Sequence, residues 1–231
     1  MRIAKYIAHS GHCSRRNAEK LIINKKVYIN GILCLKPNIN VNLNDKIRIE
    51  NKIIKIEEKI KLWKFYKPIK TLCTNNDLQN RKTIFDILPI NFPRVISIGR
   101  LDLMSEGLLL LTNNGDFARK IELPSSNVER IYKVCIQGIV SQQVILKINS
   151  GILIQKILYK KVKVKILKSN EKNSWLLFSL KEGKNREIRN ICKYFKLKIT
   201  KLIRTQYGSI KLGNLKNGEI KEVKNFKDLL C

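Results

Sequence analysis

The sequence predicts an α+β protein of two parts, and three observations support that prediction. The first sixty residues carry helical periodicity followed by a hairpin signal, which is typical of a small helix-and-strand module. Residues 61–231 alternate strand-like and helix-like patches without a fixed period, which indicates a mixed sheet and not a repeat array. The charged stretch 57–61 lies between the two parts. We therefore predict domains at residues 1–60 and 61–231.

The first module should contain two short helices and then a hairpin. Apolar residues at 3–8 predict a helix, and Ser14 is placed to cap a second helix whose apolar face includes residues 18–22. Asn30-Gly31 between two apolar runs predicts a two-residue hairpin turn. Another strand is expected at 46–49.

The second module begins with an apolar run and is rich in strand-like segments. These lie at 62–66, 95–98, 130–134 and 161–166. In the last of them Lys161, Lys163 and Lys165 alternate with apolar residues, which we interpret as the solvated face of a half-buried strand. Residues 188–195 have apolar positions at helical spacing, with basic residues on the opposite face.

Net charge is the strongest compositional feature. The 231 residues include 47 Lys and Arg against 18 Asp and Glu, a net charge of +29. Such an excess repels itself unless a polyanion offsets it, so nucleic acid is the leading partner. Lysine-rich coding drift in an AT-rich genome is the alternative source of part of the charge. With 44% apolar residues the chain can bury a core.

Nothing in the sequence favours a membrane or an export route. No run reaches the roughly 18 consecutive apolar residues of a spanning helix. No basic helix carries a Trp, Phe and Leu face for binding at a membrane surface. The opening residues Met1–Lys5 form no signal-peptide apolar region. We therefore expect a soluble, cytoplasmic protein without a membrane partner.

Metal and cofactor chemistry is not indicated either. The cysteines at 13, 34, 73, 135, 192 and 231 form no C-x-x-C pair. His9 and His12 have no neighbouring Cys or carboxylate that would complete a tetrahedral set. Neither G-x-x-x-x-G-K nor G-x-G-x-x-G is present. The sequence predicts no metal and no small-molecule cofactor.

Three segments of the first module, Arg2–Lys5, Ser10–Glu19 and Val27–Gly31, resemble an αL-type S4 RNA-binding domain. The alternative is any other small helix–helix–hairpin module. The resemblance implies that Arg15 and Arg16 contact RNA phosphates and that this module holds substrate without catalysing a reaction.

Asp102 is the leading candidate for chemistry in the second module. It follows the strand-like run 95–98, so its carboxylate is expected at a strand end that faces a cleft. On spacing alone, an Asx turn or a helix-capping aspartate is the alternative. The resemblance to a family that the surrounding residues show favours a carboxylate that faces a cleft.

Gly99–Asp102 with Ser105–Asn113 resembles the catalytic motif of the ribosomal pseudouridine synthases of the RsuA/RluB type, which carry an N-terminal S4 domain. Similar segments continue in order along nearly the whole chain, at Tyr66–Pro68, Arg81–Asp86, Arg130–Tyr132, Glu182–Arg189, Leu202–Arg204 and Tyr207–Gly208. His12 and the stretches 66–77 and 202–208 are most similar to the B-type enzymes, which act on 23S (large-subunit) ribosomal RNA.

The resemblance implies roles for individual residues. Asp102 would be the nucleophile, and Arg189 would pair with it and keep it charged. Tyr132 would stack on the flipped uracil and take part in removing the C5 proton, although an ordinary strand aromatic is the alternative. Arg100 would enter the RNA stack as the target leaves it. Arg186 would contact the RNA backbone, with a solvated basic face as the alternative.

We therefore expect a monomeric RNA pseudouridine synthase that isomerises a uridine of ribosomal RNA without a cofactor. Its mixed-sheet catalytic domain would follow the S4 domain. The alternatives are a synthase for 16S (small-subunit) ribosomal RNA, a non-catalytic ribosome-assembly protein that keeps the fold, and a sequence-blind RNA chaperone. Two departures from the family pattern stand out: Glu187 replaces a Gln, and Asn190-Ile191 replaces paired arginines.

Overall fold

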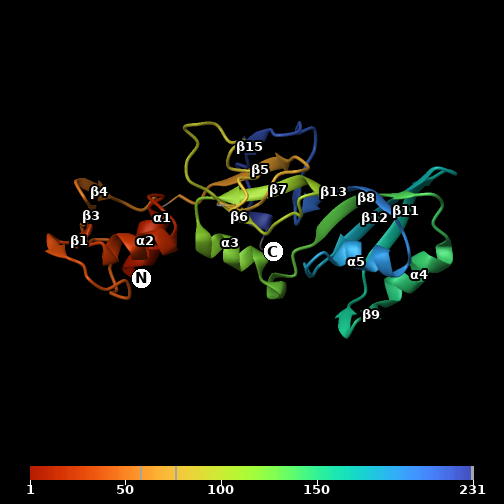
Figure 1. Cartoon of the computed structure of the whole chain (residues 1–231), viewed down its shortest axis with the longest axis horizontal. Helices are drawn as coiled ribbons and strands as arrows, with labels where there is room; N and C mark the ends of the chain where they lie inside the picture. Colours follow the sequence, from red (N-terminus) through yellow and green to blue (C-terminus); the bar gives the residue numbers. More distant parts are fainter. Residues whose placement is uncertain (58, 76, 230–231) are drawn as a thin grey trace. The chain divides into compact units, whose positions relative to one another are not determined.

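The computed structural model describes residues 1–57, 59–75 and 77–229 (Figure 1). The chain forms two compact units. The first comprises Met1–Lys61, Pro89–Ile96 and Thr112–Phe117. The second comprises Leu62–Leu88, Ser97–Leu111 and the chain from Ala118 onward. The division of the chain into domains at residues 60 and 61 stays a prediction.

The first unit begins with two helices, α1 (Ile3–His9) and α2 (Arg15–Ile23). The Ser14 hydroxyl accepts a hydrogen bond from the amide of Asn17, so the predicted helix cap is present. The helices are followed by an antiparallel sheet in the order β2-β1-β3-β4, with strands β1 (Val27–Ile29), β2 (Ile32–Leu33), β3 (Ile47–Ile49) and β4 (Lys52–Ile54).

The turn between β1 and β2 has the expected geometry. Asn30 and Gly31 have φ angles of 51° and 87°, the left-handed values that a two-residue hairpin turn requires. The two helices and one face of the sheet share a buried apolar core that includes Ile3, Ile22 and Ile47.

The second unit is built on a mixed sheet in the order β11-β12-β8-β13-β7-β5-β15. Its central junction is parallel, with Ile203 of β13 (Ile199–Tyr207) opposite Glu106 of β7 (Glu106–Thr112). The β8 strand (Arg130–Gln137) pairs antiparallel with β13 and with β12 (Asn173–Leu180). The remaining strands are β5 (Leu62–Lys67), β6 (Ile96–Ile98), β11 (Lys163–Ser169), β14 (Ile210–Lys211) and β15 (Ile220–Glu222).

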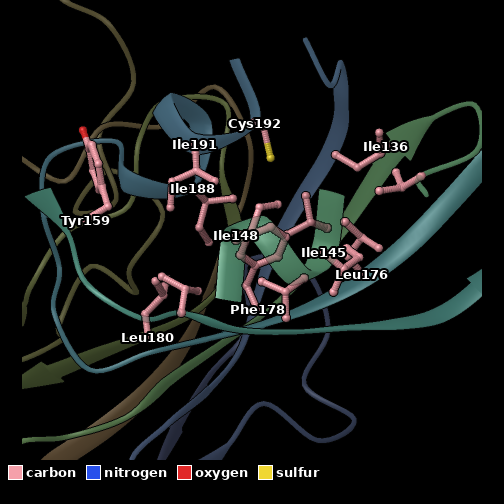
Figure 2. Close-up of a cluster of buried hydrophobic side chains, with 14 of the residues drawn as sticks. Ile136, Ile145, Ile148, Tyr159, Leu176, Phe178, Leu180, Ile188, Ile191 and Cys192 are labelled. Atoms are coloured by element: carbon pink, nitrogen blue, oxygen red, sulfur yellow. The ribbon is translucent and has the colours of Figure 1, made fainter. Parts of the chain in front are cut away.

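Two helices cover one face of this sheet. Residues of α4 (Gln142–Ser150) and α5 (Glu187–Tyr194) share an apolar cluster with alternate residues of β8, β12 and β13. Figure 2 shows Ile145 and Ile148 of α4 gathered with Phe178 of β12, with Ile188 and Ile191 of α5 nearby. The apolar stripe predicted for residues 188–195 therefore packs on the sheet, and the polar side chains of α5 lie on the side of the helix away from this cluster.

The remaining elements are a short hairpin of β9 (Ile152–Ile154) and β10 (Ile157–Tyr159), the helix α3 (Gly115–Glu122), and two turns of 3₁₀-helix at Pro124–Ser126 and Lys227–Leu229. The predicted α+β class is confirmed. In the part of the chain that the structure describes, every helix is too short to cross a membrane.

Candidate active site

The second unit contains a cavity of about 980 Å³ at the sheet face beside α5. Its walls come from six segments that are far apart in the sequence: residues 72–74, the β6–β7 loop, residues 122–124, the start of β8, residues 180–189 and part of β13. The cavity is large enough to admit a small molecule or a single nucleotide. Asp102, Tyr132 and Arg189 all line it.

Asp102 lies in the loop between β6 and β7, with its side chain 33% exposed. Two guanidinium groups approach one of its carboxylate oxygens. Arg189 Nε lies 3.4 Å from Oδ2, and Arg186 Nη1 lies 3.5 Å from the same atom. Both arginines thus form ion pairs with the carboxylate, a group that can act as a nucleophile.

Arg189 also holds the backbone that carries Asp102. Its Nη2 donates to the carbonyl oxygen of Met104 at 2.8 Å and to the hydroxyl of Ser105 at 3.1 Å. Its Nε is buried and forms the ion pair with Asp102 without the alignment of a hydrogen bond. The side chain of Arg189 is only 17% exposed, so bulk water screens these interactions weakly.

Lys67 supports the same loop from the end of β5. Its side chain is fully buried, and its Nζ donates to the carbonyl oxygens of Pro68 and Ser105, each at 2.8 Å. Burial lowers the pKa of Lys67 to about 8, against the opposing pull of the negative charges that Cys73, Asp102 and Glu106 can carry. A lysine buried this deeply is costly, so its two carbonyl partners indicate a positioning role.

Further contacts complete the support of the loop. The Cys73 thiol exchanges two weak hydrogen bonds with the backbone of Leu101, both at 3.5 Å. The amide of Ser105 donates to the carbonyl oxygen of Asp102 at 3.0 Å, which closes a turn. The Tyr66 hydroxyl donates to Glu106 at 3.0 Å where β7 begins. The carboxylate of Asp102 is therefore carried by a loop that is fixed on both sides.

Tyr132 stands on β8, directly opposite Arg204 of β13. The guanidinium carbon of Arg204 lies 6.0 Å from the centroid of the Tyr132 ring and 5.2 Å from that of Tyr207. Arg130, two residues before Tyr132, donates to the Tyr207 hydroxyl at 2.9 Å and to the carbonyl oxygen of Lys181 at 2.8 Å. Aromatic rings and guanidinium groups thus alternate along one wall of the cavity.

The other predicted site residues lie in different places. Arg100 is exposed at the cavity, and Arg186 is also exposed there but in ion-pair contact with Asp102. Arg186 has a φ of 51° and forms the residue just before α5. Arg15 and Arg16 are exposed in the first turn of α2, in the first unit. No structural feature tests the roles predicted for these residues.

Lys67 and Arg204 were not identified as site residues from the sequence, although the strand period contains a signal. Lys67 is two residues after buried Phe65 on β5, and Arg204 is two residues after buried Leu202 on β13. Alternate residues of a strand share a face, so both cations fall in phase with apolar core positions. A charged residue in that phase is a candidate for a buried functional group.

The chemistry open to this cavity is that of an ionised carboxylate beside an aromatic ring, in a pocket rich in positive charge. Such a carboxylate can attack or stabilise an electron-poor carbon, and the flanking cations can stabilise negative charge that develops nearby. Across the described residues, no three His, Cys, Asp or Glu side chains are grouped to hold a metal ion.

Comparison with known proteins gives consistent matches for both units. Residues 61–194 match the family described as RNA pseudouridylate synthase, and residues 1–57 match the S4 domain. A Rickettsia typhi sequence named an uncharacterized RNA pseudouridine synthase is 51% identical over 97% of this chain and 92% of its own length.

More distant relatives agree. The protein named ribosomal large subunit pseudouridine synthase B from Buchnera aphidicola is 36% identical, over 96% of this chain and 92% of its own length. A crystal structure of a pseudouridylate synthase superposes with a TM-score of 0.68 at 26% identity, covering 97% of this chain and 96% of the other.

Proposed function

This chain belongs to the RNA pseudouridylate synthase family, and from that premise we propose that it isomerises a uridine of large-subunit ribosomal RNA to pseudouridine. The enzyme is an RNA pseudouridine synthase. The S4 domain supports an RNA substrate, and the proposal that this RNA is large-subunit ribosomal RNA draws support from the name of the Buchnera aphidicola relative.

The observation that carries the proposal is the Asp102 carboxylate held between Arg186 and Arg189 in a cavity that can admit one nucleotide. In this isomerisation the N1–C1′ bond breaks, C5 bonds to C1′, C5 loses a proton and N1 gains one. No atom enters or leaves overall. The reaction therefore needs a nucleophile or charge stabiliser, a proton acceptor and a pocket for a flipped base.

The residues of the cavity can divide this work. Asp102 acts on the sugar or on the base, and Arg189 pairs with the carboxylate and fixes its loop. Tyr132 offers a ring against which the extruded uracil stacks and a hydroxyl that can relay the C5 proton, giving up its own proton as it takes one. Arg100, which is exposed and lines the cavity, would fill the gap that the flipped nucleotide leaves.

The other parts of the proposal concern the whole protein. Arg15 and Arg16 on α2 would hold the RNA backbone without reading its sequence. We propose that the enzyme works as a cytoplasmic monomer, with a division between its two domains near residue 60.

The test is to map pseudouridine in purified ribosomal RNA with and without the protein. RNA transcribed in vitro is incubated with the enzyme, treated with carbodiimide, and read by reverse transcription, which stops at each pseudouridine. A single new stop in large-subunit RNA, with none in small-subunit RNA, is the expected result. A stop only in small-subunit RNA would show that small-subunit RNA is the substrate and would contradict the large-subunit proposal.

A non-catalytic assembly protein would behave differently in the same experiment. It would bind the RNA, as a filter or gel-shift assay would show, and it would add no stop on naked RNA or on assembling subunits. Equal stops across unrelated hairpins would contradict site-specific action.

A further inference from the structure

We propose that Arg204 recognises the target base, with its guanidinium donating a hydrogen bond to a carbonyl oxygen of the uracil in the cavity. This inference rests on the proposed function and adds a substrate-contacting residue to it.

The first observation is that Arg204 has an unused donor. It lies in the middle of β13 and is only 2% exposed. Its Nε donates to the carbonyl oxygen of Leu108 at 2.6 Å, whereas its Nη2 is buried without an acceptor among the described residues. Almost all buried donors in folded proteins have a partner, so this guanidinium nitrogen is available to an acceptor that enters the cavity with a ligand.

The second observation is its position. Arg204 forms part of the cavity wall, as do Asp102 and Tyr132. Cross-strand pairing sets Arg204 opposite Tyr132, the residue expected to stack on the base. A base stacked on that ring would present its edge to the guanidinium beside it.

Two other buried cations differ from Arg204 in their hydrogen bonds. Arg130 has acceptors for both terminal nitrogens, the carbonyl oxygen of Lys181 and the hydroxyl of Tyr207. Lys67 donates to two carbonyl oxygens. Both residues are buried, Arg130 in the cavity wall and Lys67 against the loop that carries Asp102, and their hydrogen bonds assign them to the support of the fold.

Uracil has the chemistry that suits this donor. A guanidinium offers only donors, and uracil carries two carbonyl oxygens that accept. When the N1–C1′ bond breaks with its electron pair on the base, the negative charge spreads from N1 onto these oxygens. A hydrogen bond from a guanidinium strengthens as its acceptor becomes negative, so the contact would favour the detached base over the bound nucleotide.

The test replaces one uracil oxygen at a time by sulfur, a weaker acceptor. Once mapping has located the target, RNAs are prepared with uridine, 2-thiouridine or 4-thiouridine at that position, and kcat/KM is measured for each. For the wild-type enzyme we expect one of the two thio substrates to be slower than uridine by about tenfold, the loss of one charge-assisted hydrogen bond. The position that is slowed identifies the oxygen.

The variant Arg204→Met removes the donor and keeps a side chain of similar length. Its kcat/KM for uridine should fall toward that for the slowed thio substrate, so that the two agree within about threefold. Arg130→Met is the matched control, because it removes a buried cavity arginine whose donors are already used. It should lower activity on all three RNAs and keep the wild-type ratio between them.

Two results would overturn the inference. One is an equal kcat/KM of the wild-type enzyme for uridine and for both thio substrates. This result rules out the inference even if Arg204→Met fails to fold. The other is a thio effect of unchanged size in folded Arg204→Met, judged by circular dichroism. Either result leaves the proposed function intact if wild-type enzyme isomerises the uridine RNA, and failure on that RNA counts against the proposed function itself.

Discussion

At the scale of single residues, the two arginines beside Asp102 differ in what they hold. Arg189 is 17% exposed and contacts both the carboxylate and the backbone of its loop, whereas Arg186 is 54% exposed and contacts the carboxylate alone. Exposed ion pairs contribute little because water and salt screen them, and buried hydrogen-bonded charges contribute much more. Similar distances to Asp102 therefore do not imply similar importance.

Replacing each arginine by alanine tests this difference. Arg189→Ala should lower kcat/KM by about a hundredfold or more, mostly in kcat, because the carboxylate and its loop both lose their anchor. Arg186→Ala should cost no more than about fivefold, in line with an exposed ion pair. Kinetics with the mapped RNA at two salt concentrations would measure both. An equal loss in the two variants would contradict the account.

Lys67 gives a prediction about pH. Burial lowers its pKa to about 8 from an ordinary value of 10.5, so between these two values the unfolded chain binds more protons at this residue than the folded protein does. Stability must then rise with pH across that window. Below about pH 8 the buried positive charge is a full penalty, and above about 10.5 the penalty is gone.

The comparison is between wild type and Lys67→Met, since titration of the exposed lysines is common to both and cancels. The free energy of unfolding of wild type relative to the variant should increase from pH 8 to pH 10, by at most about 1.4 kcal/mol per pH unit. Urea unfolding at several pH values measures it. A difference that stays flat or falls with pH would show that Lys67 is not buried as a charged group.

At the scale of elements, the parallel junction of β7 and β13 determines how the cavity is assembled. It brings Glu106, which follows the Asp102 loop, beside Ile203, next to Arg204. Gly107 makes this approach possible. It has a φ of 99°, and a Cβ at this position would collide with the backbone oxygen of Arg204 and lie 2.9 Å from its nitrogen.

Gly107→Ala should therefore destabilise the protein strongly, by about 3 kcal/mol or more, because strain in the left-handed region adds to a backbone collision that cannot relax cheaply. Gly138→Ala is the matched control. Gly138 has a φ of 80° with open space around its Cβ position, so only the conformational cost of about 1 kcal/mol applies. Thermal or urea unfolding of both variants measures the difference, and equal losses would contradict a close contact at Gly107.

Local elements of this protein could be predicted where the signal lies within a few residues. The Ser14 cap and the Asn30-Gly31 turn are present because each depends on neighbouring residues alone. The partners of Arg204 could not be predicted, because they depend on which strands adjoin in the sheet. The contact of Arg186 with Asp102 could not be predicted either. It depends on the left-handed conformation of Arg186 just before α5, which the sequence pattern does not indicate.

At the scale of the whole molecule, the order of motifs along the chain was enough to predict the family and the α+β class. It was not enough to predict the cavity, whose walls come from six separated segments of the second unit. A family resemblance names the residues of a site, and the three-dimensional structure shows which of their donors are satisfied. Arg130 and Arg204 illustrate the difference, as both are buried arginines of the same cavity.

The net charge of +29 makes RNA binding strongly dependent on salt, but charge alone does not locate the contacts. The double variant Arg15→Gln/Arg16→Gln should reduce the slope of log affinity against log salt by roughly 1.4 to 1.8, the share of two phosphate contacts. At saturating RNA its kcat should match wild type. Lys52→Gln/Lys55→Gln, which removes two exposed charges elsewhere in the first unit, should change the slope less. Equal slopes for both double variants would indicate that the first unit attracts RNA by its overall positive charge, without specific phosphate contacts at Arg15 and Arg16.

The most direct test of the catalytic role of Asp102 is a single-turnover measurement with Asp102→Asn, because the amide keeps the shape of the side chain and removes its negative charge. Asp77→Asn serves as the control, since Asp77 also pairs with an arginine, Arg81, but does not line the cavity. We expect Asp102→Asn to bind the mapped RNA as tightly as wild type and to form no pseudouridine, whereas Asp77→Asn stays active. Product formation by Asp102→Asn at the wild-type rate would contradict that role.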